Sequence, residues 1–282
     1  MEQVFLNGSL VPASQARIGI DDSSFLYGIG LFETMRAVGG RVFRFSDHWQ
    51  RLADSAQALS IVNSYSKEEV QDAVGQVLRA NQLTDARIRL TLTGGSLRAE
   101  ENRRSTLLIT ATAFVPYPKE YFEKGVRVVI TDYRQNPKDP FAGHKTTCYG
   151  PRLAALRVAH EKLAAEALWF TTENRLAEGC ISNVFLVRQG KLLTPPLSTP
   201  VLPGIARKTV LELARQEKIS TEERPLDIND LLAAEEVFLT NVIMTILPVI
   251  AVEGHTVGEG KPGPVTKSLT QKYEEKLRDS TL

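Results

Sequence analysis

The residue of this chain best suited to covalent chemistry is Lys145, in the polar segment Gly143–Pro151, which opens directly into an apolar pattern with helical spacing. A lysine just ahead of a helix has no packing role there, and its neutral amine can form an imine with an aldehyde cofactor. The alternative is a solvated loop lysine, the commoner state of this residue type. Lys145 is therefore a candidate for a covalent cofactor link.

A carboxylate follows 33 residues (178 − 145) further along. Glu178 lies in the segment Arg175–Val187, between apolar residues at the start of a run that predicts a strand. Later, Leu202–Ile205 leads into a predicted helix, and the unpaired N–H groups at a helix N-terminus favour phosphate binding. An amine, a carboxylate and a helix N-terminus suited to phosphate thus follow one another along the chain.

An arginine and a histidine lie close together on an earlier predicted helix. Ser46 is expected to cap a helix from Asp47 to Leu59, which carries His48-Trp49-Gln50-Arg51-Leu52. The planar guanidinium of Arg51 can donate two hydrogen bonds to one phosphate and keeps its charge. A surface arginine is the alternative reading. His48 is expected to pack or to cap rather than to act in catalysis.

In this order, these segments resemble the class IV aminotransferase family, the fold-type IV enzymes that use pyridoxal 5′-phosphate. The resemblance extends from the region of Asp22 to Pro264. The family includes branched-chain aminotransferases, D-amino-acid aminotransferases and aminodeoxychorismate lyases. It implies an α+β fold with a small α/β N-terminal domain and a larger C-terminal domain, which is built on a β-barrel-like sheet with helices.

The resemblance also implies a role for each cofactor residue. Lys145 would hold pyridoxal phosphate as a Schiff base and move the proton between substrate carbon and cofactor. Glu178 would face the pyridine nitrogen and keep it protonated, so that the ring withdraws electrons. The other implied contacts are the hydroxyl of Tyr149 near the ring's phenolic oxygen and, around the phosphate, Arg51, the amides of Ile205 and Ala206, and the pair Thr240-Asn241.

The substrate pocket is expected to draw on the N-terminal domain. Tyr27 and Phe32 lie in a glycine-punctuated predicted strand, Phe25–Ala37, that resembles the family's first active-site segment; both could instead be core aromatics. The candidates for binding the substrate carboxylate are Arg87, Arg89 and Arg98. Arg89 alternates with apolar neighbours and so could point from a strand into the pocket, although an outward charged face is the alternative.

The choice of reaction depends on a few positions. Thr240-Asn241 stands where branched-chain enzymes usually have Gly-Thr, and Phe32-Glu33-Thr34 lacks their glycine, whereas the tail Gly258–Lys267 looks like theirs. Cys148 and Ala206 also depart from frequent family residues but block no step. Because an apolar pocket is penalised for burying polar groups without partners, Thr240, Asn241 and Arg89 favour a polar substrate.

The reaction expected on these grounds is that of 4-amino-4-deoxychorismate lyase, which yields 4-aminobenzoate and pyruvate for folate biosynthesis. The alternative is a class IV aminotransferase of branched-chain or D-amino acids with 2-oxoglutarate or pyruvate. A scaffold or binding protein without activity is a third reading. It would have little reason to retain Lys145, Glu178 and Arg51 together.

Composition limits the partners. The 282 residues include 34 basic and 33 acidic side chains, and a net charge of +1 leaves no electrostatic footprint for nucleic acid. The amino terminus enters a strand-turn pattern at once and no apolar run approaches a membrane span, so we expect a cytoplasmic protein without a membrane partner. Cys148 and Cys180 have no metal-type spacing. A small-molecule amino substrate is expected, and the resemblance implies a homodimer.

The elements that must position these residues are expected to form two domains. The boundary between the domains is expected at Val115–Pro118, where two prolines interrupt a strand pattern. Residues 1–116 are expected to form a small domain of two helices against an antiparallel sheet, and residues 117–282 the cofactor-binding domain. The main predicted helices span residues 47–59, 67–80, 151–165 and 207–216, followed by a final amphipathic helix. The main predicted strands span residues 86–93, 105–113, 126–130, 167–172, 183–187 and 191–194, with two more within 236–249.

Overall fold

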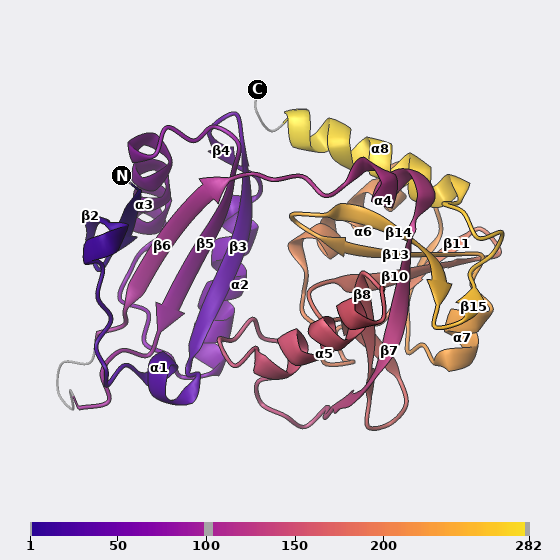
Figure 1. The fold of residues 1–282 in the computed structure, drawn as a ribbon, viewed down its shortest axis with the longest axis horizontal. Coiled ribbons are helices and arrows are strands. Elements are labelled where there is room, and N and C mark those ends of the chain that lie inside the picture. Colours follow the sequence, from indigo (N-terminus) through magenta and orange to yellow (C-terminus); the bar gives the residue numbers. More distant parts are fainter. Residues whose placement is uncertain (1, 99–103, 280–282) are drawn as a thin grey trace. The chain divides into compact units, whose positions relative to one another are not determined.

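The computed structural model describes residues 2–98 and 104–279, and the chain divides into two units (Figure 1). The first unit comprises residues 1–115, 144–148 and 277–282, and the second comprises residues 116–143 and 149–276. The segment that carries Lys145 was expected in the C-terminal domain, but its contacts place it in the first unit. Residues 99–103 belong to the polar loop between the strands predicted at residues 86–93 and 105–113, and they lie outside the described residues.

The first unit is built on a six-stranded antiparallel sheet in the order β2-β1-β6-β5-β3-β4. Its longest pairing joins β3 and β5, from Gly30 opposite Thr93 to Ala37 opposite Ala86. The elements are β1 (Gln3–Leu6), β2 (Ser9–Pro12), η1 (Ala13–Gln15), α1 (Ser23–Tyr27), β3 (Gly30–Val38), β4 (Arg41–Val42), α2 (Phe45–Ala58), α3 (Lys67–Ala80), β5 (Ala86–Thr93) and β6 (Leu107–Ala113).

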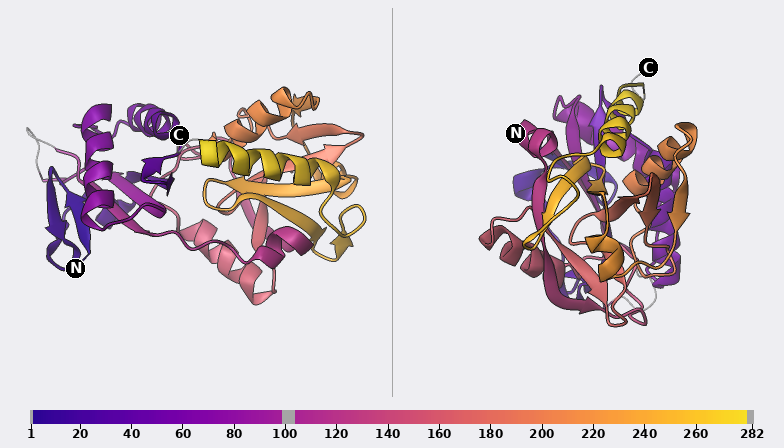
Figure 2. Two further views of the ribbon diagram at one scale, coloured as in Figure 1. Left: turned by 90° about the horizontal axis from the view of Figure 1, so that it is seen from above. Right: turned by 90° about the vertical axis from the view of Figure 1, so that its right-hand side faces the viewer.

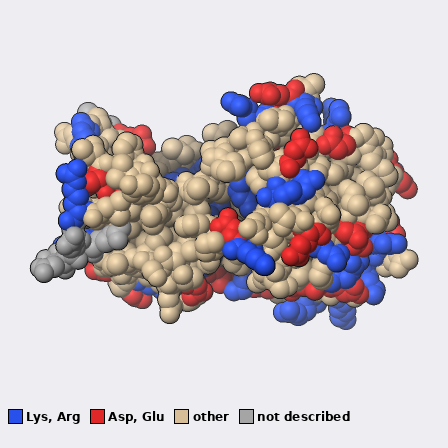
Figure 3. All heavy atoms as spheres, turned by 90° about the horizontal axis from the view of Figure 1, so that it is seen from below, with Lys and Arg blue, Asp and Glu red and all other residues tan. Residues whose placement is uncertain are grey.

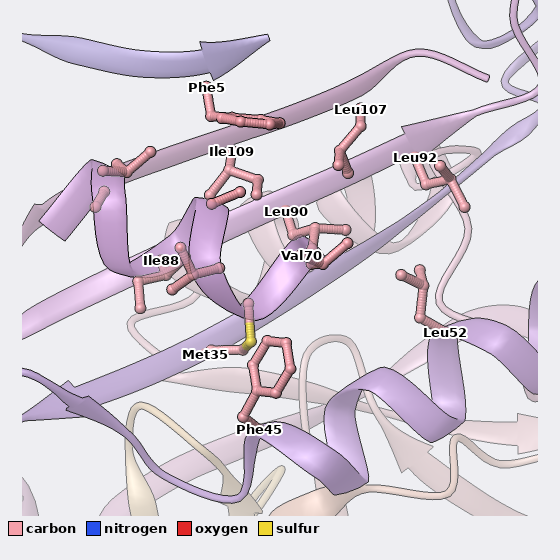
Figure 4. Packing of buried hydrophobic residues seen from close by; sticks show 14 of the residues in the cluster. Phe5, Met35, Phe45, Leu52, Val70, Ile88, Leu90, Leu92, Leu107 and Ile109 are labelled. Carbon is pink, nitrogen blue, oxygen red and sulfur yellow. The ribbon is translucent and has the colours of Figure 1, made fainter. Parts of the chain in front are cut away.

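One face of this sheet packs against α2 and α3 and forms the core of the unit (Figure 4). Successive side chains of a strand point to opposite faces, so the apolar residues of β5 are buried under the helices: Ile88, Leu90 and Leu92. Leu52 of α2 and Val70 of α3 belong to the same cluster. The polar residues that alternate with them, Arg89 among them, belong to the other face.

Helix α1 differs from the sequence-based prediction, which placed residues 25–37 in one strand. Asp22 caps the helix by accepting a hydrogen bond from the backbone N–H of Ser24 at 2.9 Å, and Gly28 ends it with a positive φ of 69°. The strand β3 begins only at Gly30. Tyr27 and Phe32 therefore belong to different elements.

The two long helices of the first unit begin differently. Helix α3 has the predicted bounds, and Ser66 and Glu69 form a reciprocal capping box at its start. The predicted cap of α2 is wrong: the helix starts at Phe45, before Ser46, and its N-cap residue is Arg44 in the left-handed conformation.

The second unit is built on a curled nine-stranded sheet in the order β12-β11-β10-β13-β14-β7-β8-β9, with β15 paired to β14 (Figures 1 and 2). Three pairings are parallel, β11 with β12, β14 with β7, and β7 with β8. Its strands are β7 (Val126–Gln135), β8 (Glu166–Thr171), β9 (Leu176–Gly179), β10 (Asn183–Arg188), β11 (Lys191–Thr194), β12 (Thr221–Glu223), β13 (Glu236–Asn241), β14 (Thr245–Val252) and β15 (His255–Thr256). The helices are α4 (Lys119–Lys124), α5 (Gly150–Glu161), α6 (Ile205–Gln216), α7 (Ile228–Leu232) and α8 (Pro264–Asp279).

Strand β8 is buried on both faces. Leu168 and Phe170 belong to one apolar cluster, while Ala167 and Trp169 belong to another that includes Ala155 of α5. A polar side chain on such a strand must find its hydrogen-bond partners inside the protein. Glu166, at the start of β8, is the residue to which this applies.

The surface of the second unit carries charges of both signs side by side, as Figure 3 shows for one of its faces. This mixture agrees with the net charge of +1. Among the described residues, no helix has both the length and the apolar character needed to cross a bilayer.

Candidate active site

The segment around Lys145 is fixed to the edge of β3. The backbone N–H of Phe32 donates to the carbonyl of Lys145 at 2.8 Å, and that of Thr147 donates to Gly30 at 2.9 Å. Leu31 and Thr146 form an antiparallel bridge between these two bonds. The side chain of Thr147 adds a bond to the carbonyl of Gly28 at 2.8 Å. Lys145 therefore sits on a strand-like segment and not in a solvated loop.

Three of the predicted site residues come together on this side of the first unit. The Nζ of Lys145 lies 4.5 Å from the ring centroid of Phe32, and the guanidinium carbon of Arg89 lies 3.4 Å from the same centroid. The Phe32 side chain is buried, and Arg89 lies diagonally across from it on the neighbouring strand. An amine and a guanidinium thus lie against one aromatic ring, which suits an amino acid or keto acid carboxylate placed beside the amine.

The opposite face of β3 carries a buried charged group. Arg51 donates to both carboxylate oxygens of Glu33, from Nε at 2.8 Å and from Nη2 at 2.6 Å, and Nδ1 of His48 lies 2.7 Å from Oε2. Burial disfavours the charge of Glu33, but the charge of Arg51 and the bond to His48 outweigh it and lower the pKa of Glu33 to about 2. Burial is the main cause that lowers the pKa of His48.

Arg51 is 8% exposed, so the surface alternative for this residue is excluded. Glu33 occupies part of its donor set, although a guanidinium has five N–H groups in all. The fork is therefore fixed in orientation by Glu33. His48 is buried against Glu33, in agreement with its predicted packing role.

The other substrate candidates of the first unit lie on its surface. Tyr27 is 67% exposed at the end of α1. Arg98 is exposed in the turn after β5, where its backbone N–H donates to Ser96. Within the part of the chain that the structure describes, no hydrogen bond or ring contact joins either residue to the cluster of Lys145, Phe32 and Arg89.

In the second unit, Glu178 lies near the end of β9, and both oxygens of its buried carboxylate accept hydrogen bonds. Its Oε1 accepts from Nη2 of Arg152 at 2.6 Å. Its Oε2 accepts from the backbone N–H of Leu202 at 3.0 Å and from Nδ2 of Asn183 at 3.3 Å. The side chain is 4% exposed. The sequence-based prediction of Glu178 did not include Arg152 or Asn183; an arginine in the first turn of α5 and a polar residue opening β10 were the signals that could have indicated them.

A second buried carboxylate lies close to Glu178 in sequence and structure. Glu166 accepts from the backbone N–H of Ile181 at 2.6 Å and from the hydroxyl of Ser182 at 2.5 Å. Burial raises the pKa of Glu166 to about 7, against these two bonds, which favour the charged form. Gly179 is required here, because any β-carbon would collide with Ser182 and Glu166. Glu166 was not predicted as a site residue, since nothing in the spacing of β8 distinguishes it from a surface glutamate.

Tyr149 is the N-cap residue of α5, and its hydroxyl donates to the carbonyl of Cys180 at 2.7 Å. Burial raises the pKa of Tyr149 above its ordinary value. The phenolic proton is therefore directed at the protein backbone. Contact with a cofactor oxygen would require the hydroxyl to turn or to accept a hydrogen bond. Both cysteines are free thiols, Cys148 exposed and Cys180 buried.

The start of α6 fits an anion. Gly204 is the N-cap residue, and in the described chain no side chain caps this helix, so the first amides of α6, those of Ile205 and Ala206, point out of its end. Asn183 holds the preceding turn by donating to the carbonyl of Leu202 at 2.9 Å. A twelve-residue helix with this end presents the donor set that a phosphate requires.

The side chains of Thr240 and Asn241 form hydrogen bonds within the hairpin between β13 and β14. The hydroxyl of Thr240 donates to the carbonyl of Thr245 at 2.5 Å. The amide of Asn241 donates to Ile181 at 3.1 Å, and its oxygen accepts from the backbone N–H groups of Ile243 and Met244 at 2.9 Å. These polar groups have partners inside the protein. The expectation that they would penalise an apolar substrate is therefore wrong.

The residues present fit pyridoxal phosphate, which needs an amine, a carboxylate for the ring nitrogen and donors for a phosphate. The sequence of this chain matches the family model described as amino-transferase class IV over residues 30–252. The chain belongs to the class IV aminotransferase family. It is accordingly an enzyme, and its cofactor is pyridoxal 5′-phosphate.

Individual relatives extend this result. The chain is 34% identical over 278 residues to a Methanocaldococcus jannaschii protein named "Putative branched-chain-amino-acid aminotransferase", a match that covers 97% of this chain and 96% of that protein. It is 28% identical to the D-alanine aminotransferase of Bacillus licheniformis, over 99% of this chain and 98% of the relative.

Solved structures of similar proteins also match this chain. The branched-chain amino acid aminotransferase of Escherichia coli matches with a TM-score of 0.91 at 30% identity, over 97% of this chain and 94% of that one. A structure from Legionella pneumophila titled "Putative 4-amino-4-deoxychorismate lyase" matches with a TM-score of 0.85 at 28% identity, over 94% and 97% of the two chains. The predicted α+β, fold-type IV architecture is confirmed.

Proposed function

We propose that this enzyme is an aminotransferase that moves amino groups between a branched-chain amino acid and 2-oxoglutarate. The observation that carries the proposal is the cluster of Phe32, Lys145 and Arg89. It places a guanidinium that can bind a carboxylate close to the amine, with both held against one aromatic ring. Relatives at 34% and 30% identity that carry the branched-chain name support this choice over the lyase favoured by the sequence.

Each residue has a separate task in the proposed reaction. When bound, pyridoxal phosphate supplies the aldehyde that takes up the amino group and a ring that withdraws electrons. Lys145 carries the covalent link and moves the proton at the substrate α-carbon. Glu178 would accept a hydrogen bond from the protonated ring nitrogen, and its burial would strengthen that interaction. Arg51 and the amides of Ile205 and Ala206 would hold the phosphate.

Arg89 is proposed to bind the substrate carboxylate. Arg89→Met should raise the KM for 2-oxoglutarate by about 10- to 100-fold, because a charge-assisted hydrogen bond is lost. Arg87→Met is the matched control, since Arg87 lies two residues earlier on the same strand and is exposed. Equal effects of the two substitutions would show that Arg89 acts only through surface charge.

Two other reactions remain as outcomes of a direct test. The Legionella structure and the Phe32-Glu33-Thr34 pattern support 4-amino-4-deoxychorismate lyase, and the Bacillus relative supports D-amino-acid transfer. The test compares kcat/KM for L-leucine and D-alanine, each with 2-oxoglutarate and with pyruvate, and for 4-amino-4-deoxychorismate alone. We expect L-leucine with 2-oxoglutarate to be fastest. A clear preference for either of the other substrates would overturn the proposal and leave the cofactor assignment intact.

We also propose that the enzyme is a homodimer that acts in the cytoplasm. The support is family membership together with ordinary globular composition and a near-zero net charge. Sedimentation of the purified enzyme tests whether it is a homodimer.

A further inference from the structure

Arg152 is the direct partner of the carboxylate that is proposed to face the cofactor ring. Its Nη2 lies 2.6 Å from Oε1 of Glu178, and their side chains are 21% and 4% exposed. An arginine–carboxylate contact of this length is a charge-assisted hydrogen bond, about twice as strong as a neutral one. The charge of Glu178 is thus compensated inside the second unit by a residue from α5.

Arg152 is itself held from several sides. Its Nη1 donates to the carbonyl of Gly179 at 2.9 Å, and Nη2 reaches Oε1 of Gln135 at 3.4 Å. The guanidinium carbon lies 5.4 Å from the ring centroid of Trp169. Burial opposes the charge of Arg152, but Glu178 outweighs it and raises the pKa of Arg152 above its ordinary value. The guanidinium therefore stays charged and keeps one orientation.

The other oxygen of Glu178 is fixed as well, by Leu202 and Asn183. Both of these donors are neutral, so Arg152 is the single cationic donor seen on this carboxylate in the described chain. A carboxylate oxygen can accept about two hydrogen bonds, and Arg152 occupies one position on Oε1. Among residues 2–98 and 104–279 no other donor is seen on Oε1, which leaves a second acceptor position for a donor such as a pyridinium N–H.

We propose that Arg152 is a positioning residue for Glu178, which it holds as an oriented anion toward the ring nitrogen of the cofactor. This inference rests on the proposed role of Glu178. A buried anion that loses its cationic partner is strongly destabilised, and the carboxylate would turn away or lose its charge. Arg152 thus affects the cofactor through Glu178 and touches neither cofactor nor substrate.

The test compares the holoenzymes of Arg152→Met, Arg152→Lys, Glu178→Gln and the double variant Arg152→Met/Glu178→Gln. The first readout is the visible absorbance of the bound cofactor from about pH 6 to about pH 9, which reports charge at the ring. The second is turnover. Glu178→Gln should lower kcat by about 100- to 10,000-fold with the cofactor still bound.

We expect Arg152→Met to shift the absorbance titration in the same direction as Glu178→Gln and to lower kcat by about 10- to 100-fold, with KM changed about twofold or less. The double variant should be no slower than Glu178→Gln, because residues that act through one another are not additive. Arg152→Lys should lie between wild type and Arg152→Met, since lysine keeps the charge but not the fork. Arg157→Met is the control: it makes the same change on α5, where Arg157 pairs with Glu161 in an exposed contact.

An unchanged absorbance titration in Arg152→Met, or a double variant whose loss is the product of the two single losses, would overturn the inference. If Arg152→Met does not fold, the same criteria apply to Arg152→Lys alone and combined with Glu178→Gln. Failure of the proposed function is seen separately, as a wild-type enzyme that does not transfer amino groups.

Discussion

Glu166→Gln should remove a pH-dependent part of the stability of the second unit. Glu166 is 1% exposed, and burial raises its pKa from 4.5 to about 7. Between these two values the folded protein keeps a proton that the unfolded chain has already released. This contribution to stability is therefore full below pH 4.5 and is lost as the pH rises toward 7.

The size of the effect follows from the two pKa values. Their difference of 2.5 (7 − 4.5) corresponds to about 3.4 kcal/mol, of which about 2.5 kcal/mol is lost between pH 5 and pH 8. Glutamine has the shape of the protonated acid and cannot ionise. The free energy of unfolding of the wild type should thus fall by about 2.5 kcal/mol relative to the variant over this range.

The assay is urea unfolding of the apoprotein, since bound cofactor would add its own pH-dependent stabilisation. Trp169 lies on β8 with Glu166, so its fluorescence in a Trp49→Phe background reports the second unit. Glu173→Gln, an exposed glutamate just after β8, is the control and should parallel the wild type. The reasoning is refuted if wild type and Glu166→Gln give parallel curves from pH 5 to pH 8.

Three further outcomes are expected. Borohydride reduction and peptide mapping should place the cofactor on Lys145; a label on another lysine would show that the wrong residue had been chosen. Ser66→Ala should destabilise the first unit by about 1 kcal/mol in urea unfolding followed by Trp49 fluorescence, while Glu69→Gln, which keeps a capping side chain, should cost less. Sedimentation should give a dimer at working concentration, and a fully active monomer would contradict that proposal.

The parts of the site that the sequence predicted are those with a local signal. Lys145 and Glu178 stand in short segments whose order matches the family, and the bounds of α3, Lys67–Ala80, follow from its local pattern. The residues it missed depend on contacts between distant segments. Arg152 is defined by a carboxylate 26 residues away, and Glu166 by a turn 15 residues away.

Local sequence patterns also gave wrong predictions where the same residues fit two structures. Residues 25–27 carry an apolar pattern that fits a strand, yet Asp22 and Gly28 supply the ends of a short helix, and these ends prevail. Thr240 and Asn241 look like pocket residues in the sequence. Their side chains close a hairpin whose turn geometry can be seen only once β13 and β14 are paired.

The attachment of residues 144–148 to β3 limits how the two units can be produced as separate fragments. The chain passes from one unit to the other after Val115, Gly143, Cys148 and Lys276, so no single cut separates them. A fragment ending at Val115 would lack the reactive lysine and would leave the backbone of Gly30 and Phe32 without the partners it has here. An unpaired strand edge promotes association with other chains. Efforts to express the N-terminal part alone should therefore yield an aggregating fragment, unless residues 144–148 are supplied through a linker.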